Sequence, residues 1–190
     1  MLGAELYARL YFITKEEKYK ELAQQMTNFT IAYQKEDGRW NYSIDIETGK
    51  ERTQIDFHQG YVLDSIHYVN KYCGENEAYT KAITIGVSYY FKYQFKPNGQ
   101  SIFRVPNEYP VEIHNQAQGI ITLTRLAYLS DEYANFAKVI AEWTVDNMQS
   151  KKGYFYYKKY PLYTIKTPFM RWSQAWMFLA LTELKNAQNG

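Results

Sequence analysis

Apolar side chains recur at three- and four-residue intervals along most of the chain, and this spacing predicts seven helices. In the first of them, for example, Leu6, Leu10 and Ile13 fall on one face. The helices are expected at residues 2–13, 16–34, 56–72, 77–95, 115–129, 131–148 and 171–186. Strand-like patterns are confined to two short aromatic runs, residues 40–42 and 154–157. The pattern therefore predicts an all-α protein.

The connections between these helices alternate in length. Residues 14–15, 73–76 and 130 form short joins, and joins of this length force antiparallel helical hairpins. The other three connections are about twenty residues long, and each begins with a glycine-centred turn, at Gly38, Gly99 and Gly153. All three long loops are therefore expected on one face of the hairpins, where long loops are more often functional than structural.

Charge distinguishes two kinds of helix. The helix at 115–129 carries a single charged side chain, Arg125, whereas the helix at 131–148 carries several acidic and basic ones. A helix that is apolar on most sides is buried, while an amphipathic helix faces solvent. We therefore expect the first, third, fifth and seventh helices to form an inner layer wrapped by the second, fourth and sixth. This arrangement is an α/α toroid, or part of one.

A short polar phrase recurs where each long loop meets its inner helix. It reads Asp-Phe-His-Gln at residues 56–59, Glu-Ile-His-Asn at 112–115, which is 56 residues later, and Arg-Trp-Ser-Gln at 171–174. Self-similarity at a nearly fixed period indicates repeated supersecondary units. The copies are therefore expected to lie side by side in successive repeats.

The repeated phrases and their surroundings, residues 56–60, 112–118 and 168–176, resemble those of a bacterial family of six-hairpin, glycosidase-like (α/α)6 toroids. Members of that family are often encoded beside genes for surface-polysaccharide synthesis, and the resemblance covers nearly the whole chain. It implies a carbohydrate-active protein, since the broad superfamily contains glycoside hydrolases, unsaturated-uronyl hydrolases, sugar epimerases and polysaccharide lyases. It does not choose among these reactions, because fold is not function.

The length of the chain is the one large departure from that family. Six hairpins of this period need roughly 340 residues, and this chain has 190. We therefore expect residues 1–190 to form a single α/α-hairpin domain that is the C-terminal part of a longer toroid. The apolar flanks of its outermost inner helices would then be covered by upstream sequence or by a second copy in a homodimer. These flanks are Leu6, Tyr7, Leu10 and Tyr11 on one side and Trp176, Phe178 and Leu179 on the other.

The repeated phrase supplies candidates for acid/base catalysis. Asp56 and Glu112 would be separated by about the 6.5–9.5 Å that inverting glycosidases use, because adjacent helices pack roughly 8–10 Å apart. His58 and His114 lie at helix N-termini, where the dipole favours a neutral imidazole suited to general-base work. Structural alternatives remain open. Asp56 and Gln59 also match a capping box, and Asp56 and Glu112 would otherwise be two unrelated carboxylates in loops.

A second group of residues is predicted to bind substrate. Arg171 suits a carboxylate or phosphate group, or else a salt bridge to Glu112 or Asp56. Polar amides within apolar helices need partners, either sugar hydroxyls or other helices. Aromatic side chains near the long loops suit stacking on sugar rings or loop packing. The predicted set is Trp40, Tyr42, Gln116, Gln118, Tyr156, Arg171, Trp172 and Gln174.

The composition of the chain limits the classes of binding partner and the cellular compartment that we expect. With 22 basic and 20 acidic residues the chain has no global field, so nucleic acid is not implied. No stretch approaches the roughly 18 apolar residues of a membrane span. The lone Cys73 excludes an internal disulfide and fits a reducing, cytoplasmic setting. Neither HExxH nor paired CxxC motifs occur, and we expect no metal and no cofactor.

Two other functions stay open. An isoprenoid enzyme would share the toroid, but the DxDD cyclase motif is absent, and Cys73, needed for a prenyltransferase zinc set, lies in a short turn on the opposite face. A non-catalytic helical-repeat module would bind glycan or protein. Its usual repeat is about 34–47 residues, shorter than the period seen here.

Overall fold

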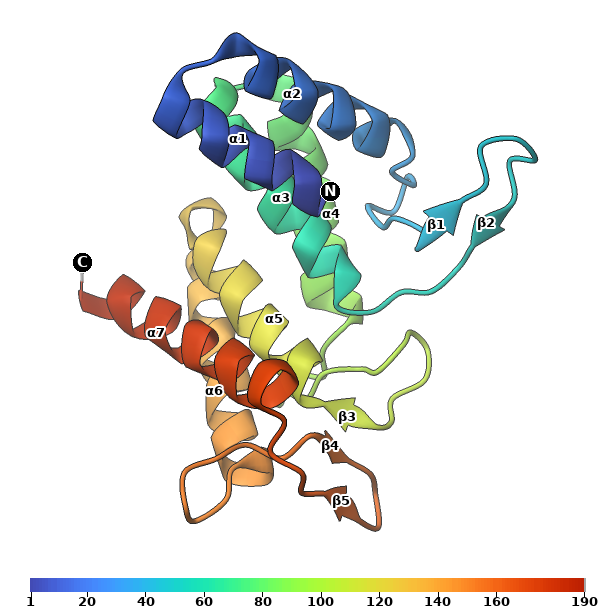
Figure 1. The fold of residues 1–190 in the computed structure, drawn as a ribbon. Coiled ribbons are helices and arrows are strands. Elements are labelled where there is room, and N and C mark those ends of the chain that lie inside the picture. Colours follow the sequence, from blue (N-terminus) through green and yellow to red (C-terminus); the bar gives the residue numbers. More distant parts are fainter. Residues whose placement is uncertain (190) are drawn as a thin grey trace. The chain divides into compact units, whose positions relative to one another are not determined.

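The computed structural model describes residues 1–189, and most of them are helical (Figure 1). All seven expected helices are present among the described residues, and only their ends differ by a few positions. Their bounds are α1 (Leu2–Thr14), α2 (Glu17–Ala32), α3 (His58–Cys73), α4 (Glu77–Tyr93), α5 (Ile113–Arg125), α6 (Asp131–Met148) and α7 (Trp176–Asn189). A 3-10 turn (Ala127–Leu129) follows α5, and a π-helical turn (Met170–Ala175) precedes α7.

The strands are short and lie in the long connections. They are β1 (Ser43–Ile44), β2 (Glu51–Arg52), β3 (Val111–Glu112), β4 (Lys158–Lys159) and β5 (Thr164–Ile165). β1 pairs antiparallel with β2, and a second sheet has the order β3-β4-β5, also antiparallel. The expected strand positions at 40–42 and 154–157 were therefore wrong by a few residues. At Trp40 the reason is visible, because a glutamine side chain rather than a strand holds its backbone N–H and carbonyl.

The chain divides into two compact units, residues 1–90 and 91–190. In the first unit, α1 packs against both α2 and α3. Its contact positions are the small side chains of Ala4 and Ala8, which are fully buried, and α3 contributes Leu63, Ile66 and Val69 to the core. The expectation of a single domain over the whole chain is not tested by this division and stays a prediction.

In the second unit, α5 is the central helix. It packs against both α6 and α7, and every residue from Ile113 to Leu123 is buried. A helix enclosed in this way needs apolar residues on most sides, which explains its lack of charge before Arg125. Arg125 itself donates from Nε to the Glu183 carboxylate of α7 at 3.0 Å. The predicted inner position of this helix is therefore confirmed within its unit.

Each long connection is held to the next inner helix by a glutamine, and we call Gln59, Gln116 and Gln174 the glutamine clamps. The Gln59 Oε1 accepts from the Trp40 N–H at 2.9 Å, and its Nε2 donates to the Trp40 carbonyl at 2.7 Å. Gln174 makes the same pair of bonds to Phe155, at 2.9 and 2.8 Å. Gln116 accepts from the Ser101 N–H at 2.6 Å, and it donates to the Gly99 carbonyl at 3.2 Å.

The glycine turns that open these connections share one backbone shape but differ in their surroundings. Gly38, Gly99 and Gly153 all have left-handed φ values, of 99°, 91° and 92°. A Cβ at Gly38 would lie 2.4 Å from the Ile85 carbonyl oxygen of α4, and one at Gly99 would lie 2.6 Å from that of Val139 in α6. Among residues 1–189, a Cβ at Gly153 would meet nothing within 4 Å. The first two turns are therefore pressed against the backbone of the following outer helix.

Apolar side chains are exposed on the two helices where this was expected. Leu6 of α1 is 57% exposed, and Phe178 and Leu179 of α7 are 75% and 37% exposed. Tyr7, Leu10, Tyr11 and Trp176 are only partly exposed. No helix within residues 1–189 is both long enough and apolar enough to cross a membrane.

Candidate functional site

The candidate site in the first unit lies where the chain leaves β2 and enters α3. The Asp56 side chain is buried, and its Oδ1 lies 2.6 Å from the His58 Nδ1 and accepts from the His58 backbone N–H at 3.1 Å. Its Oδ2 accepts from the Gln54 Nε2 at 2.7 Å. Both oxygens of the carboxylate are therefore occupied inside the protein, and we call this arrangement the Asp56–His58 pair.

The environment keeps Asp56 ionised. Burial alone would raise the pKa of the Asp56 carboxyl, but the hydrogen bonds from His58 and Gln54 outweigh burial and hold that pKa below its ordinary value. An anionic carboxylate can only accept, so the His58 Nδ1 carries a proton toward it. In the neutral ring, the second nitrogen, Nε2, then keeps its lone pair for a ligand.

His58 is the accessible member of the pair, with 37% of its side chain exposed. The ring of Phe57 stacks on it with centroids 4.3 Å apart, and the rings of Tyr42 and Tyr61 meet it edge-on at 4.9 and 5.9 Å. Tyr42 is itself exposed. A partly exposed imidazole held by a carboxylate at one nitrogen resembles the arrangement of a general base.

The capping-box alternative for Asp56 does not hold as a whole. Asp56 does accept a backbone N–H at the start of α3, as a cap would. However, the cap position is Phe57, and the Gln59 side chain turns to Trp40 instead of reaching back toward Asp56. The reciprocal half of a capping box is therefore missing.

In the second unit, Glu112 and His114 have different partners. Glu112 lies in β3 opposite Lys158 of β4, and the Lys158 Nζ is 3.6 Å from its carboxylate. Burial alone would lower the pKa of the Lys158 ammonium, but the Tyr157 hydroxyl and the Glu112 charge outweigh burial and raise it. His114 is only 1% exposed and stacks on Trp176 at 4.9 Å, with Trp172 at 5.4 Å.

Aligning the first two repeats by their glutamine clamps shifts the correspondence by one residue from the alignment of the repeated phrase. Gln59 and Gln116 play the same part, so His58 corresponds to Asn115 and not to His114. Asn115 is buried and donates to the carbonyls of Ile102 and Phe103, at 3.1 Å each. The expectation that Glu112 occupies the place of Asp56 is therefore off by one residue, because spacing alone cannot show which side chain holds the loop.

The four catalytic candidates belong to separate units, Asp56 and His58 to the first and Glu112 and His114 to the second. Their convergence on one face stays a prediction. Arg171 is exposed, and its guanidinium lies 4.7 Å from the centroid of the neighbouring Trp172 ring.

The predicted substrate-binding residues fall into two groups. Trp40, Gln116 and Gln118 are buried, and internal hydrogen bonds engage all three. Gln174 is partly exposed, but its amide is engaged by Phe155. These contacts favour the structural alternative for the glutamines. The remaining candidates, which have exposed or partly exposed surface, are Tyr42, Tyr156, Arg171 and Trp172.

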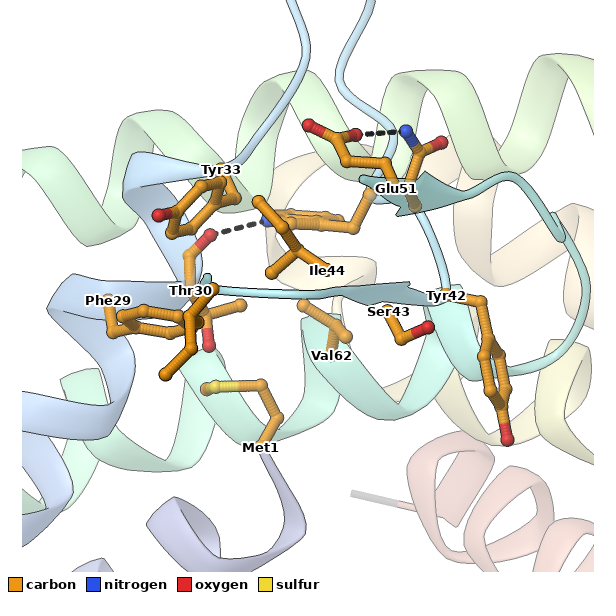
Figure 2. A pocket seen from close by; sticks show the side chains of 12 residues that line it. Met1, Phe29, Thr30, Tyr33, Tyr42, Ser43, Ile44, Glu51 and Val62 are labelled. Atoms are coloured by element: carbon orange, nitrogen blue, oxygen red, sulfur yellow. Dashed lines mark hydrogen bonds between the residues drawn. The ribbon is translucent and has the colours of Figure 1, made fainter. Parts of the chain in front are cut away.

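A cavity of about 410 Å³ lies beside Tyr42 in the first unit. Figure 2 shows Phe29 of α2, Tyr33 just after the end of α2 and Ile44 of β1 around it, while the Tyr42 ring points away from Phe29 and Tyr33. Its size falls within the usual range of small-molecule sites. The lining residues are Met1, Phe29, Thr30, Tyr33, Trp40, Asn41, Tyr42, Ser43, Ile44, Ile46, Glu51 and Val62. The Asp56–His58 pair is not part of this lining.

Among residues 1–189, no three His, Cys, Asp or Glu side chains are grouped closely enough to hold a metal ion. The Asp56–His58 pair offers one carboxylate and one imidazole, and the carboxylate oxygens are already engaged by hydrogen bonds.

Sequence reasoning missed two members of the site, Arg52 and Gln54. The Arg52 Nη2 donates to the Gln54 Oε1 at 2.7 Å, which continues the chain of hydrogen bonds away from Asp56. A signal was available, because polar residues stand at positions 52, 54, 56 and 58, every second position from the end of β2 to the start of α3.

The fold is similar to that of several solved carbohydrate-active enzymes. A cellobiose 2-epimerase from Bacillus thermoamylovorans matches 98% of this chain with a TM-score of 0.76 and 13% identity. An unsaturated glucuronyl hydrolase from a Bacillus species matches 96% with a TM-score of 0.72 and 15% identity. A family 105 glycoside hydrolase from C. acetobutylicum matches 97% with a TM-score of 0.65 and 16% identity.

The chain spans about half the length of these structures, 51%, 54% and 52% respectively. No protein-family model and no curated protein matches the sequence. At such low identity the likeness establishes the fold and nothing finer. The fold is that of the six-hairpin, glycosidase-like α/α toroids, of which this chain covers a part, as the sequence predicted.

Proposed function

We propose that this chain belongs to a carbohydrate-active enzyme that acts on an oligo- or polysaccharide by acid/base chemistry. The observation that carries the proposal is the Asp56–His58 pair, an exposed imidazole hydrogen-bonded to a buried carboxylate at 2.6 Å. The pair lies at the start of an inner helix in a fold shared with sugar epimerases and hydrolases. Hydrolysis is the first reaction to test, with epimerisation and lyase chemistry as alternatives.

In this proposal the His58 Nε2 takes a proton from water or from the sugar. The ring then becomes an imidazolium, whose positive charge is stabilised by the Asp56 carboxylate. In hydrolysis, passing a proton to the leaving oxygen regenerates the neutral ring. In epimerisation a second acid protonates the opposite face of the carbon, and His58 releases its proton to solvent. Positioned groups of this kind typically contribute about 10²–10⁴-fold to rate.

The other candidates have supporting roles in the proposal. Tyr42 and Trp172 are exposed aromatic rings suited to the apolar faces of sugars. Arg171 suits an anionic group on the substrate, such as a uronic acid carboxylate. Glu112 and His114 remain proposed partners in the chemistry.

The test is a turnover assay on two substrate types, unsaturated uronyl disaccharides and reducing disaccharides such as cellobiose. Wild-type protein is compared with His58→Gln and with His67→Gln, a matched control in the body of α3. Turnover that is lost only in the His58 variant supports the proposal. Turnover that survives His58→Gln would exclude His58 as the base, and absence of turnover on every glycan would count against an enzyme.

A non-catalytic glycan-binding module is the second candidate. It is favoured by the internal partners of Glu112 and His114, because Glu112 faces Lys158 and His114 is stacked on Trp176. Calorimetric binding of an oligosaccharide without turnover would favour this function over the first.

We also propose a bacterial, cytoplasmic setting and a covering partner for the apolar faces of α1 and α7. Cys73 is buried and unpaired, as expected of a reducing compartment. The exposed Leu6 and Phe178 suit coverage by an upstream segment or by a second copy of this chain. Cell fractionation tests the setting, and light scattering that finds a stable monomer would exclude the homodimer.

A further inference from the structure

The segment between β2 and α3 places four polar side chains in one line. In order they are Arg52, Gln54, Asp56 and His58, every second residue from the end of β2, through a bend at Asp56, to the first residue of α3. The links are Arg52 Nη2 to Gln54 Oε1 at 2.7 Å, Gln54 Nε2 to Asp56 Oδ2 at 2.7 Å, and His58 Nδ1 to Asp56 Oδ1 at 2.6 Å.

The line has a defined direction. Arg52 can only donate, so the Gln54 carbonyl oxygen must face it and the Gln54 amide nitrogen must face Asp56. An ionised carboxylate can only accept, so the proton between Asp56 and His58 belongs to the His58 Nδ1. Arg52 thus orients the Gln54 amide so that the positive end of its dipole faces the Asp56 Oδ2.

The same residues are also in contact on a second side. The Arg52 guanidinium lies 4.9 Å from the centroid of the Tyr42 ring, and Tyr42 meets His58 edge-on at 4.9 Å. Arg52 therefore reaches His58 both through Gln54 and Asp56 and across Tyr42. These contacts restrict the orientation of the imidazole ring.

We propose that Gln54 and Arg52 are positioning residues that set the tautomer of His58, with the proton on Nδ1 and the Nε2 lone pair directed to substrate. The inference rests on the proposed function, because it concerns the same base. Gln54 has the larger part, since it contacts the carboxylate directly, and the exposed Arg52 has the smaller part because solvent screens its charge.

The tautomer can be read without any substrate. The chain contains three histidines, His58, His67 and His114, so long-range 1H–15N correlation spectra of histidine-labelled protein can be assigned with single substitutions. The variants are Gln54→Met and Arg52→Met, which keep the approximate shape but remove the hydrogen bonds. Gln25→Met, an exposed change on α2, is the control.

We expect neutral His58 to show the Nδ1–H pattern in the wild type and in Gln25→Met. A fraction of the Nε2–H form should appear in Gln54→Met and a smaller fraction in Arg52→Met. A wild-type His58 in the Nε2–H form, or a Gln54→Met spectrum identical to wild type, would overturn the proposal. Thermal melting identifies any variant that has lost its fold, and Arg52→Met then serves as the second test.

A kinetic measurement completes the experiment. On any glycan that the protein turns over, Gln54→Met should lower kcat roughly ten- to hundredfold with KM unchanged, because the base keeps its place but loses its preferred tautomer. An unchanged kcat would overturn the positioning role. If no glycan is turned over, the proposed function fails, and the tautomer spectra still decide whether the line of residues sets His58.

Discussion

The phrase at residues 56–59 and the phrase at 112–115 read almost alike, yet their side chains have different surroundings. In the first, the acid accepts from the histidine two residues later, and the histidine is open to solvent. In the second, the acid faces Lys158 on a neighbouring strand, and His114 is buried against Trp176. The same residue types thus form an open acid–histidine pair in one unit and separate, enclosed contacts in the other.

The difference comes from the backbone that precedes each helix. Asp56 sits in a bend after β2, where a short acidic side chain can turn back to the start of α3. Glu112 is part of β3, and successive residues of a strand point to opposite sides, so its carboxylate is carried to Lys158. A polar motif therefore acquires its chemistry from the local backbone as much as from its residues.

The sharpest way to break this comparison is to change the two histidines one at a time. His58→Gln is expected to lower turnover by at least about 10²-fold with little change in melting temperature, because it removes an accessible base. His114→Gln is expected to lower stability by about 1–3 kcal/mol, because a buried side chain packed between aromatic rings is lost. Kinetic assays and thermal melting of both variants provide the measurements. Equal effects on both quantities would show that the two histidines are equivalent.

Asp56→Asn tests whether the carboxylate serves chemistry or folding. Turnover should be abolished, since Asn cannot stabilise the imidazolium, while the melting temperature should stay within a few degrees because Asn accepts the same backbone N–H. A large fall in melting temperature with normal specific activity would point to a purely structural role.

The same variant also has a pH signature. The Asp56 pKa is lowered in the folded state, so its contribution to stability is present above the unfolded value of about 3.9 and is lost as pH falls through the folded value. Denaturation at neutral and acidic pH should show Asp56→Asn losing less stability on acidification than the wild type. Parallel curves for the two proteins would remove Asp56 from the acid-sensitive groups.

Substituting the glutamine clamps should affect both units alike and so separates loop anchoring from chemistry. Each of Gln59→Leu, Gln116→Leu and Gln174→Leu leaves loop backbone groups without partners, at a cost of about 1–3 kcal/mol. Gln118→Leu, a buried glutamine that bonds within its own helix at Thr122, is a control expected to cost less. Chemical denaturation measures all four. An equal loss of unfolding free energy in Gln118→Leu would show that the glutamine clamps stabilise the fold no more than another buried glutamine does.

The smallest effect is expected at Glu112 and Lys158. Their closest charged atoms are 3.6 Å apart, and both side chains are partly accessible, so Glu112→Gln should change stability by no more than about 1 kcal/mol. Raised salt should weaken the wild-type contact and bring the two proteins closer together. A loss of several kcal/mol would show that this contact is a buried ion pair.

The sequence was a good guide to the helices because apolar periodicity is a strong signal over ten or more residues. The start of α7 was missed, since a π-helical turn holds residues 170–175 ahead of it. The strands were missed because runs of two residues carry no periodicity.

The candidate site was predicted in part. Asp56 and His58 could be found because they recur in a phrase with a fixed period. Gln54 and Arg52 were missed because their importance depends on hydrogen bonds along the connection between β2 and α3. The clamp role of Gln116 and Gln174 was hidden for a similar reason, since a sequence does not show whether a buried amide faces a substrate or a neighbouring loop.

The three glycine turns have a consequence for protein engineering. A Cβ at Gly38 or Gly99 would clash with the carbonyl oxygen of Ile85 or Val139, so the lack of a side chain at these turns lets a helix pack directly against the backbone. Gly153 has the same turn, and in the described part of the chain no atom lies within 4 Å of the position that a Cβ would take. A designer wishing to lengthen this array would therefore not need to invent a junction. A synthetic amphipathic helix packed against the Gly153 turn would meet a backbone shape that the turns at Gly38 and Gly99 already define.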